Sequence, residues 1–182
     1  EEVVWVNSLV DRIVSEPLQP AGAGAEPYAL WAIEAQPRLE PPCRHPAVQV
    51  VPDLGPVERR KLYVLNLGHT WMVADWLARG RQGATYVREV MADTDWAARL
   101  RALYDAEVAP GFAAAGEAQG LEAYIQTTLE RFANPYLDHR LEDISQNHGE
   151  KLDRRIGAFL AWAEQNGDTG AKPQLRAALE RR

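Results

Sequence analysis

A lysine, an asparagine and a histidine occur at close spacing in one apolar segment, KLYVLNLGHT, at residues 61–70. On a helix that turns about 100° per residue, Lys61, His69 and Asn66 fall near roughly 0°, 80° and 140°, on one arc. A desolvated lysine has a lowered pKa and can accept a proton near neutral pH. Amide donors can stabilise a developing alkoxide. The segment therefore indicates proton transfer and oxyanion stabilisation on one side of a helix.

The same three residues also fit a purely structural arrangement. Their helix is apolar almost all round, which predicts that it lies centrally in the core. In that arrangement Lys61 extends from the helix start to water, Asn66 bonds a loop carbonyl and His69 is a core histidine with satisfied hydrogen bonds. Periodicity alone leaves both interpretations open.

The elements around this segment follow from proline usage and apolar spacing. Before Pro56 we expect short strands at residues 2–6, 29–35 and 47–51, and a loop-like connector at 15–27. From Pro56 onward apolar residues recur at helical spacing. We expect helices at residues 56–79, 83–91, 94–114, 118–133, 137–162 and 171–181. The sequence predicts a mainly α fold with a few short strands near the N-terminus.

Composition excludes several classes of protein. The chain has 182 residues, of which 46% are hydrophobic, enough for one main domain. Its net charge of -6 argues against nucleic acid as a partner. No apolar stretch approaches the roughly 20 residues of a membrane span. A single cysteine, Cys43, and four scattered histidines give no metal-ligand spacing. We expect a soluble, cytoplasmic protein without a metal site.

The spacing K-x4-N-x2-H, formed by Lys61, Asn66 and His69, resembles the signature of the long-chain mannitol dehydrogenase family of polyol and uronate dehydrogenases. Further segments are similar to recurring segments of that family, in the same order: VNSLVDRI at 6–13, YALWAIE at 28–34 and RFANPYLDH at 131–139. Their wording is most similar to the tagaturonate reductase (altronate oxidoreductase) branch.

The resemblance implies one half of a two-domain enzyme. In that family an N-terminal Rossmann-type domain binds NAD or NADP, and a helical domain, similar to the C-terminal domain of 6-phosphogluconate dehydrogenase, supplies catalysis without metal. No G-x-G-x-x-G follows a strand in this sequence, so the nucleotide domain is expected to be missing from it. We expect residues 1–14 to be the last strand and hinge segment of that domain, and residues 15–182 to be the substrate-binding and catalytic domain. This chain alone is expected to be inactive.

The resemblance also implies roles in the chemical step. Lys61 would be the general acid/base, and Asn7 and Asn66 would donate hydrogen bonds to the alkoxide-like oxygen. His69 would bind a neighbouring hydroxyl of the substrate. From the residues alone, Asn7 is better explained as a turn or helix-cap residue, and the resemblance reverses that preference.

Other residues are expected to bind the distal end of the substrate or to support the site. His139 and Arg140 follow Asn134-Pro135, where members of the family contact the distal end of the substrate. A carboxylate substrate favours a guanidinium fork, which Arg60 or Arg140 could provide. We also expect Asp11 and Arg12 to form an ion pair that fixes the loop beneath the pocket.

The implied reaction interconverts a sugar alcohol or aldonate, of the mannitol, altronate or mannonate type, with the matching ketose or keto-uronate. Two other interpretations stay open: a non-catalytic helical interaction module, and an enzyme of the mannitol-1-phosphate 5-dehydrogenase type. The 6-phosphogluconate or hydroxyacid dehydrogenase type spaces its lysine and asparagine differently. The sequence does not decide the oligomeric state.

Overall fold

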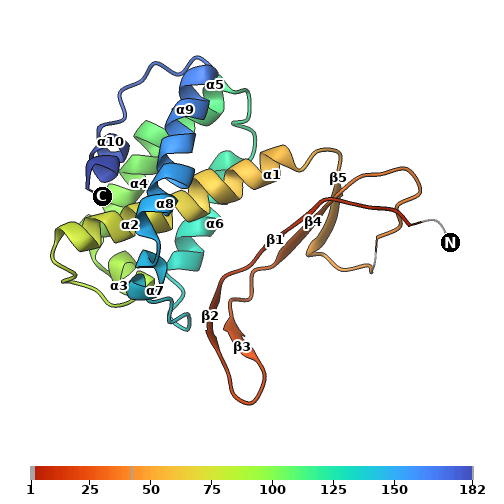
Figure 1. The fold of residues 1–182 in the computed structure, drawn as a ribbon, viewed down its shortest axis with the longest axis horizontal. Helices are drawn as coiled ribbons and strands as arrows, with labels where there is room; N and C mark the ends of the chain where they lie inside the picture. The colour runs from red at the N-terminus through yellow and green to blue at the C-terminus, as the bar shows by residue number, and fades with distance from the viewer. Residues whose placement is uncertain (1–2, 42, 182) are drawn as a thin grey trace.

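The computed structural model describes residues 3–41 and 43–181, and arranges them as a body of helices with an arm of strands at one side (Figure 1). The arm holds the N-terminal quarter of the chain, and the helices begin where it meets the body. This division agrees with the change of pattern at Pro56. The mainly helical fold with short N-terminal strands is confirmed.

The strands form two small sheets. In the first, β4 (Leu30–Glu34) lies between antiparallel β1 (Ser8–Asp11) and parallel β5 (Val48–Val51). In the second, β2 (Val14–Pro17) pairs with β3 (Ala23–Ala25) as an antiparallel hairpin. The strands predicted at 29–35 and 47–51 are thus confirmed as β4 and β5.

Two expectations for the arm are wrong. Residues 3–6 form no strand and their side chains are exposed, because pairing with β4 begins only at Ser8, opposite Ile33. Residue 2 lies outside the described residues. The connector expected at 15–27 contains the β2–β3 hairpin, whose turn is closed by the Leu18 amide donating to the Gly22 carbonyl. Proline is tolerated at the edge of so small a sheet.

The helical body follows the predicted order, with π-helical turns that the sequence pattern does not reveal. Its elements are α1 (Gly55–Arg60), η1 (Lys61–Asn66), α2 (Leu67–Ala78), α3 (Val87–Ala92), α4 (Thr94–Leu103), η2 (Tyr104–Val108), α5 (Ala109–Ala114), α6 (Leu121–Phe132), α7 (Leu141–Ser145), α8 (His148–Lys151), η3 (Leu152–Gly157), α9 (Ala158–Gln165) and α10 (Pro173–Glu180). The segments labelled η are π-helices, in which hydrogen bonds span five residues. No helix of the described residues is long and apolar enough to cross a membrane.

Two helix predictions need correction. The helix expected at 83–91 begins only at Val87, because Tyr86 forms a bridge with Arg140. The helix expected at 137–162 is interrupted: residues 137–140 precede α7, and Asn147, with a φ of 55°, separates α7 from α8. The other expected helices are confirmed, with small shifts at their ends.

The core is built around η1 and α2. Every residue from Leu67 to Trp76 is buried, so the central position predicted for this helix is confirmed for α2, whereas α1 has no buried residue. η1 packs against η2 and η3. Tyr104, the first residue of η2, donates its hydroxyl hydrogen to the Val64 carbonyl at 2.9 Å. The segment that carries Lys61 and Asn66 is therefore packed between η2 and η3.

Candidate active site

A cavity of about 360 Å³ lies where the strand arm meets the helical body. Residues 12–15 form one wall, η1 and α2 form the second, and the segment from His139 to Arg155 forms the third. The predicted site residues Lys61, Asn66, His69 and His139 all line it. The structure thus brings together four of the seven predicted residues.

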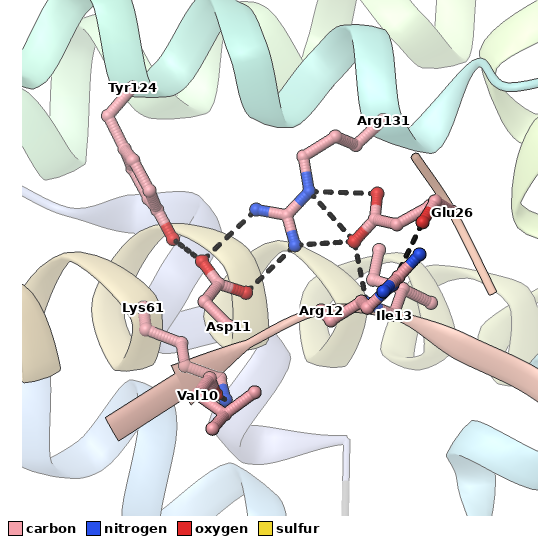
Figure 2. Close-up of polar contacts among 8 residues, drawn as sticks. All are labelled: Val10, Asp11, Arg12, Ile13, Glu26, Lys61, Tyr124 and Arg131. Carbon is pink, nitrogen blue, oxygen red and sulfur yellow. Dashed lines mark hydrogen bonds and ion pairs between the residues drawn. The ribbon is translucent and has the colours of Figure 1, made fainter. Parts of the chain in front are cut away.

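Lys61 lies at the first position of η1, half-buried at the edge of the cavity. Its Nζ donates a hydrogen bond to the backbone carbonyl of Val10 in β1 (Figure 2). The amine is therefore placed by two elements, since η1 carries the side chain and β1 supplies the acceptor. Asn66 lies at the other end of η1, where its carbonyl accepts from the hydroxyl of Thr70 at 2.9 Å.

His69 and His139 form an edge-to-face pair of imidazoles at the cavity wall. Their ring centroids are 4.7 Å apart and nearly perpendicular, and His69 also packs on Phe132 at 4.5 Å. Burial lowers the pKa of His139 to about 4 and the pKa of His69 well below its ordinary value. Both rings are therefore neutral at physiological pH. Nε2 of His69 and Nδ1 of His139 have no hydrogen-bond partner among the described residues. Such unsatisfied buried nitrogens suit the hydroxyl groups of a ligand.

The sequence did not predict two cations of the third wall, Lys151 at the end of α8 and Arg155 on η3. Lys151 donates from Nζ to the Ile144 carbonyl at 2.7 Å, and Arg155 donates from Nη1 to the Thr70 hydroxyl at 3.1 Å. Burial lowers the pKa of Lys151, and the charge of Arg155 lowers it further. Burial lowers the pKa values of His69 and His148, and the same two cations lower them further. The third wall is therefore electropositive.

A signal for these cations exists in the sequence. His148, Lys151 and Arg155 are spaced by three and four residues, so a helix places them on one side. In this region the sequence predicted only His139 and Arg140 as substrate contacts, and both precede α8. A helical wheel over residues 148–155 would have shown one basic side.

A smaller cavity of about 270 Å³ adjoins the first and shares Asn66, Lys151 and Arg155 with it. It adds Arg154 and Glu150 to the lining. A ligand longer than the first cavity can therefore extend past the two shared cations.

Three predicted residues lie outside the cavity. Asn7 is exposed, and its Nδ2 donates to Glu34 at 2.8 Å. Arg60 lines a different cavity and donates to the Gln119 carbonyl at 2.6 Å. Arg140 is exposed at the start of α7. The structure does not bring these three side chains to Lys61, and their roles stay predictions.

The ion pair expected between Asp11 and Arg12 is wrong. Asp11 pairs with Arg131 of α6 at 2.8 Å, whereas Arg12 donates from Nε to the Glu26 carbonyl at 3.0 Å (Figure 2). Asp11 is the last residue of β1 and Arg12 follows it. Successive side chains of an extended chain point to opposite sides, so these two do not meet. Arg12 accordingly faces the cavity while Asp11 is buried.

The described residues fit a substrate better than a dinucleotide. Rossmann-type sites hold a pyrophosphate at a glycine-rich turn between a strand and a helix. Among the described residues, β5 is the strand followed directly by a helix, and Pro52, Asp53 and Leu54 join it to α1. No three His, Cys, Asp or Glu side chains in the same part of the chain are grouped to hold a metal ion.

The helical fold and a cavity lined by lysine, asparagine and histidine define the class of domain. Residues 53–175 match the family model described as mannitol dehydrogenase C-terminal domain. The chain belongs to this family, so the resemblance carried by Lys61, Asn66 and His69 is confirmed at the level of the family.

Curated relatives support the same assignment. The chain is 31% identical over 175 residues to a mannitol-1-phosphate 5-dehydrogenase of Paenarthrobacter aurescens, covering 93% of this chain and 44% of that protein. It is also 31% identical over 186 residues to an altronate oxidoreductase of Bacillus subtilis, covering 92% of this chain and 37% of that protein. The chain therefore spans about two fifths of the length of these relatives.

Solved structures share the fold. A substrate-free D-sorbitol dehydrogenase superposes with a TM-score of 0.77 at 20% identity, over 97% of this chain and 39% of that one. A ternary complex of Pseudomonas fluorescens mannitol 2-dehydrogenase with NAD and D-mannitol superposes with a TM-score of 0.65 at 21% identity, over 96% and 43%. At this identity the likeness is one of fold.

Proposed function

We propose that this chain is the substrate-binding and catalytic domain of an NAD(P)-dependent oxidoreductase that acts on an anionic sugar derivative. The reaction interconverts the hydroxyl of a sugar alcohol phosphate or an aldonate with the matching ketone. The observation that carries the proposal is the cavity itself, which Lys61 and two unsatisfied imidazole nitrogens line together with Lys151 and Arg155.

Proton transfer falls to Lys61. A nicotinamide dinucleotide, held mainly by a domain outside this chain, would supply the hydride acceptor. As the carbinol carbon loses hydride, the unprotonated amine of Lys61 accepts the hydroxyl proton and the oxygen becomes a carbonyl. In the reverse direction the ammonium returns that proton. The Val10 carbonyl holds the amine at the cavity edge.

Asn66 and His69 bind the reacting region. The Asn66 side chain supplies amide donors for an oxygen that gains negative charge, a contribution worth about 3 kcal/mol per donor in other enzymes. The neutral ring of His69 offers one donor and one acceptor to a neighbouring hydroxyl. The partner ring of His139 extends this hydroxyl-binding surface along the chain of the substrate.

The anionic end of the substrate is assigned to Lys151 and Arg155. Burial lowers the pKa values of Lys151 and His69, and the positive charge of Arg155 lowers both further; Asp143 is the acidic residue that lines the same cavity. A phosphate or carboxylate there relieves this repulsion and accepts charge-assisted hydrogen bonds. The names of the relatives, mannitol-1-phosphate 5-dehydrogenase and altronate oxidoreductase, support both anions.

The nucleotide domain is assigned to the outer side of the strand arm. Val10, Trp31 and Val50 share one side of the first sheet by register, and they are 57%, 37% and 44% exposed. Trp5, three residues before the start of β1, is 87% exposed. A row of exposed apolar side chains indicates an interface. Because the chain spans about two fifths of its relatives, the remaining domain is the occupant we assign to it.

The test is a steady-state screen of the protein that carries this domain together with its nucleotide domain. Mannitol, arabinitol, mannonate, altronate and mannitol 1-phosphate are each offered with NAD and with NADP. We expect one anionic substrate to exceed mannitol in kcat/KM by about tenfold or more, since each charge-assisted hydrogen bond contributes about 1.5 to 3 kcal/mol.

Lys151→Met and Arg155→Met sharpen the test. Each is expected to raise KM for the anionic substrate by about tenfold or more and to leave KM for mannitol within about twofold. Lys172→Met, which removes a cation of the same charge outside both cavities, is the matched control. Equal losses for mannitol and for the anion would contradict the assignment of the anionic end. Turnover of no substrate with either cofactor would favour the non-catalytic module.

A further inference from the structure

Arg131 lies between two carboxylates in the interior (Figure 2). Arg131 is 5% exposed, and Asp11 and Glu26 are each 1% exposed. Its Nη2 is 2.8 Å from Asp11 Oδ1 and 2.8 Å from Glu26 Oε1, and its Nε is 3.0 Å from Glu26 Oε2. We call these three residues the Arg131 cluster. None of them lines the cavity that contains Lys61.

Stability alone explains such a cluster poorly. Taking charges out of water costs several kcal/mol per ion, and well-packed apolar residues of similar volume are often as stable or more so. The cluster also has one more negative charge than positive charge. What a bidentate guanidinium provides better than apolar packing is fixed geometry. The segments that it joins therefore indicate what it does.

The Arg131 cluster anchors residues 10–13 to α6. Asp11 accepts hydrogen bonds from Arg131 and a further one from the Tyr124 hydroxyl at 2.8 Å. The Ile13 amide donates to Glu26 Oε1 at 2.6 Å. This short segment is thus fixed at two positions, and its continuation forms the first wall of the cavity.

The same segment supplies the acceptor for Lys61. The Val10 carbonyl, which accepts from Lys61 Nζ, belongs to the peptide unit whose nitrogen is that of Asp11 (Figure 2). Because a peptide unit is planar, a shift of the Asp11 backbone moves the Val10 oxygen with it. The buried charges on one side of β1 are therefore coupled to the amine on the other side.

We propose that Arg131, acting through Asp11 and Glu26, is a positioning residue that fixes the Val10 carbonyl and thereby orients the Lys61 amine in the cavity. The inference rests on the proposed function, in which Lys61 transfers the proton. It extends that function to a cluster that touches neither the cavity nor a ligand.

The direct test observes Lys61 without requiring activity. The 182-residue chain is labelled with ¹³C at lysine Cε, and the Lys61 resonance is assigned with Lys61→Arg. We expect Tyr124→Phe, Asp11→Asn and Arg131→Lys to shift that resonance. The shift should increase in this order, because each variant weakens the hydrogen bonds that fix Asp11 more than the one before. Tyr124→Phe leaves no buried charge unpaired, so it tests the coupling even where the other variants unfold.

Lys172→Met is the matched control. It breaks another buried ion pair, Lys172 with Asp168, whose side chains are 4% and 6% exposed and lie outside the cavity. It is expected to lower the melting temperature and to leave the Lys61 resonance in place. An unchanged Lys61 resonance in folded Tyr124→Phe and Asp11→Asn would overturn the inference. A displacement as large in Lys172→Met would overturn it too.

Kinetics separate this inference from the proposed function. In the protein with its nucleotide domain, Asp11→Asn is expected to lower kcat about tenfold or more and to keep KM within about threefold, because misplacing a catalytic group by 1 Å can cost about 100-fold. Normal turnover by Lys61→Ala would refute the proposed function and leave the resonance test valid. Loss of turnover in Lys61→Ala with unchanged kcat in Asp11→Asn would refute the positioning role alone.

Discussion

His69 and His139 meet edge to face, with their ring centroids 4.7 Å apart, although five helical elements, from α3 to α6, separate their segments in the chain. Both rings are neutral in the folded protein because burial lowers their pKa values, to about 4 for His139 and well below the ordinary value for His69. Lys151, Arg155 and Arg131 oppose protonation of the pair, and Asp143 alone favours it at His139. Protonation of either histidine at low pH would therefore place an unfavourable positive charge in the cavity wall.

Acid is expected to destabilise the protein through these histidines. The ordinary pKa of 6.5 applies in the unfolded chain, and the folded value of His139 is about 4, so the unfolded state binds more protons between these two values. The contribution of His139 to the free energy of unfolding is fully present above about pH 6.5. It is lost as pH falls towards 4, which lowers the free energy of unfolding by up to about 3 kcal/mol. Urea unfolding across this range measures the slope.

His139→Gln is expected to flatten that dependence, because the replacement does not titrate. The exposed His45, replaced by glutamine in the same way, is the control and should keep the slope of the parent chain. The same slope in His139→Gln and in the parent would show that burial of this ring does not contribute to acid sensitivity.

Much of the fold and part of the site were accessible from the sequence. Helical spacing after Pro56 located the helical body, and the short strands β4 and β5 followed from alternation. The spacing of Lys61, Asn66 and His69 placed three cavity residues on one segment. These features depend on local pattern, which a single sequence contains.

The features that were missed depend on tertiary contacts. A helical wheel assumes about 100° per residue, but Lys61–Asn66 is π-helical. The wider π-helical turn could not be predicted from the local sequence pattern. The partner of Asp11 lies 120 positions along the chain, at Arg131, whereas spacing suggested the neighbouring Arg12. Asn7 bonds Glu34 across the sheet, so its side chain does not reach Lys61.

Replacement of Lys61 by alanine is expected to abolish most turnover. General acid-base catalysis typically contributes about 10² to 10⁴ in rate, so kcat of the protein with its nucleotide domain should fall by that range. The dissociation constant for the dinucleotide should stay within about twofold, because Lys61 lies in the substrate cavity. Stopped-flow measurement of hydride transfer and a fluorescence titration give the two quantities.

Arg60→Ala, one position earlier, is the control for that experiment. Arg60 bonds the Gln119 carbonyl and lines a different cavity, so its loss should alter kcat far less than the loss of Lys61. Comparable losses in the two variants would argue that the kinetic effect reflects the helix start and not the amine.

The 182-residue chain by itself is expected to bind no dinucleotide at micromolar concentration and to oxidise no polyol. Its described residues have no glycine-rich turn between a strand and a helix, and Pro52, Asp53 and Leu54 fill the connection that comes nearest to that position. Titration of NADH fluorescence measures binding, and absorbance of NADH measures turnover. Saturable binding in the micromolar range would contradict the assignment of the cofactor to another domain.

Gly68 and Tyr104 provide a test of how tightly α2 and η2 are packed beside the site. A Cβ at Gly68 would lie 2.0 Å from the Tyr104 hydroxyl oxygen and 3.1 Å from Phe132. That hydroxyl is fixed, because it donates to the Val64 carbonyl at 2.9 Å. Gly68→Ala is therefore expected to lower the free energy of unfolding by about 3 kcal/mol, measured by urea denaturation.

A double-mutant cycle identifies the clash. Tyr104→Phe alone should cost about 1 kcal/mol through the lost hydrogen bond. In that background the nearest atoms to the new Cβ are 3.1 Å away, so Gly68→Ala should cost about 1 to 2 kcal/mol less than in the parent. Gly149→Ala, where a Cβ meets nothing within 4 Å, is the control and should be neutral or stabilise the helix by about 1 kcal/mol. Equal costs of Gly68→Ala in both backgrounds would mean that the hydroxyl does not limit the approach of α2 to η2.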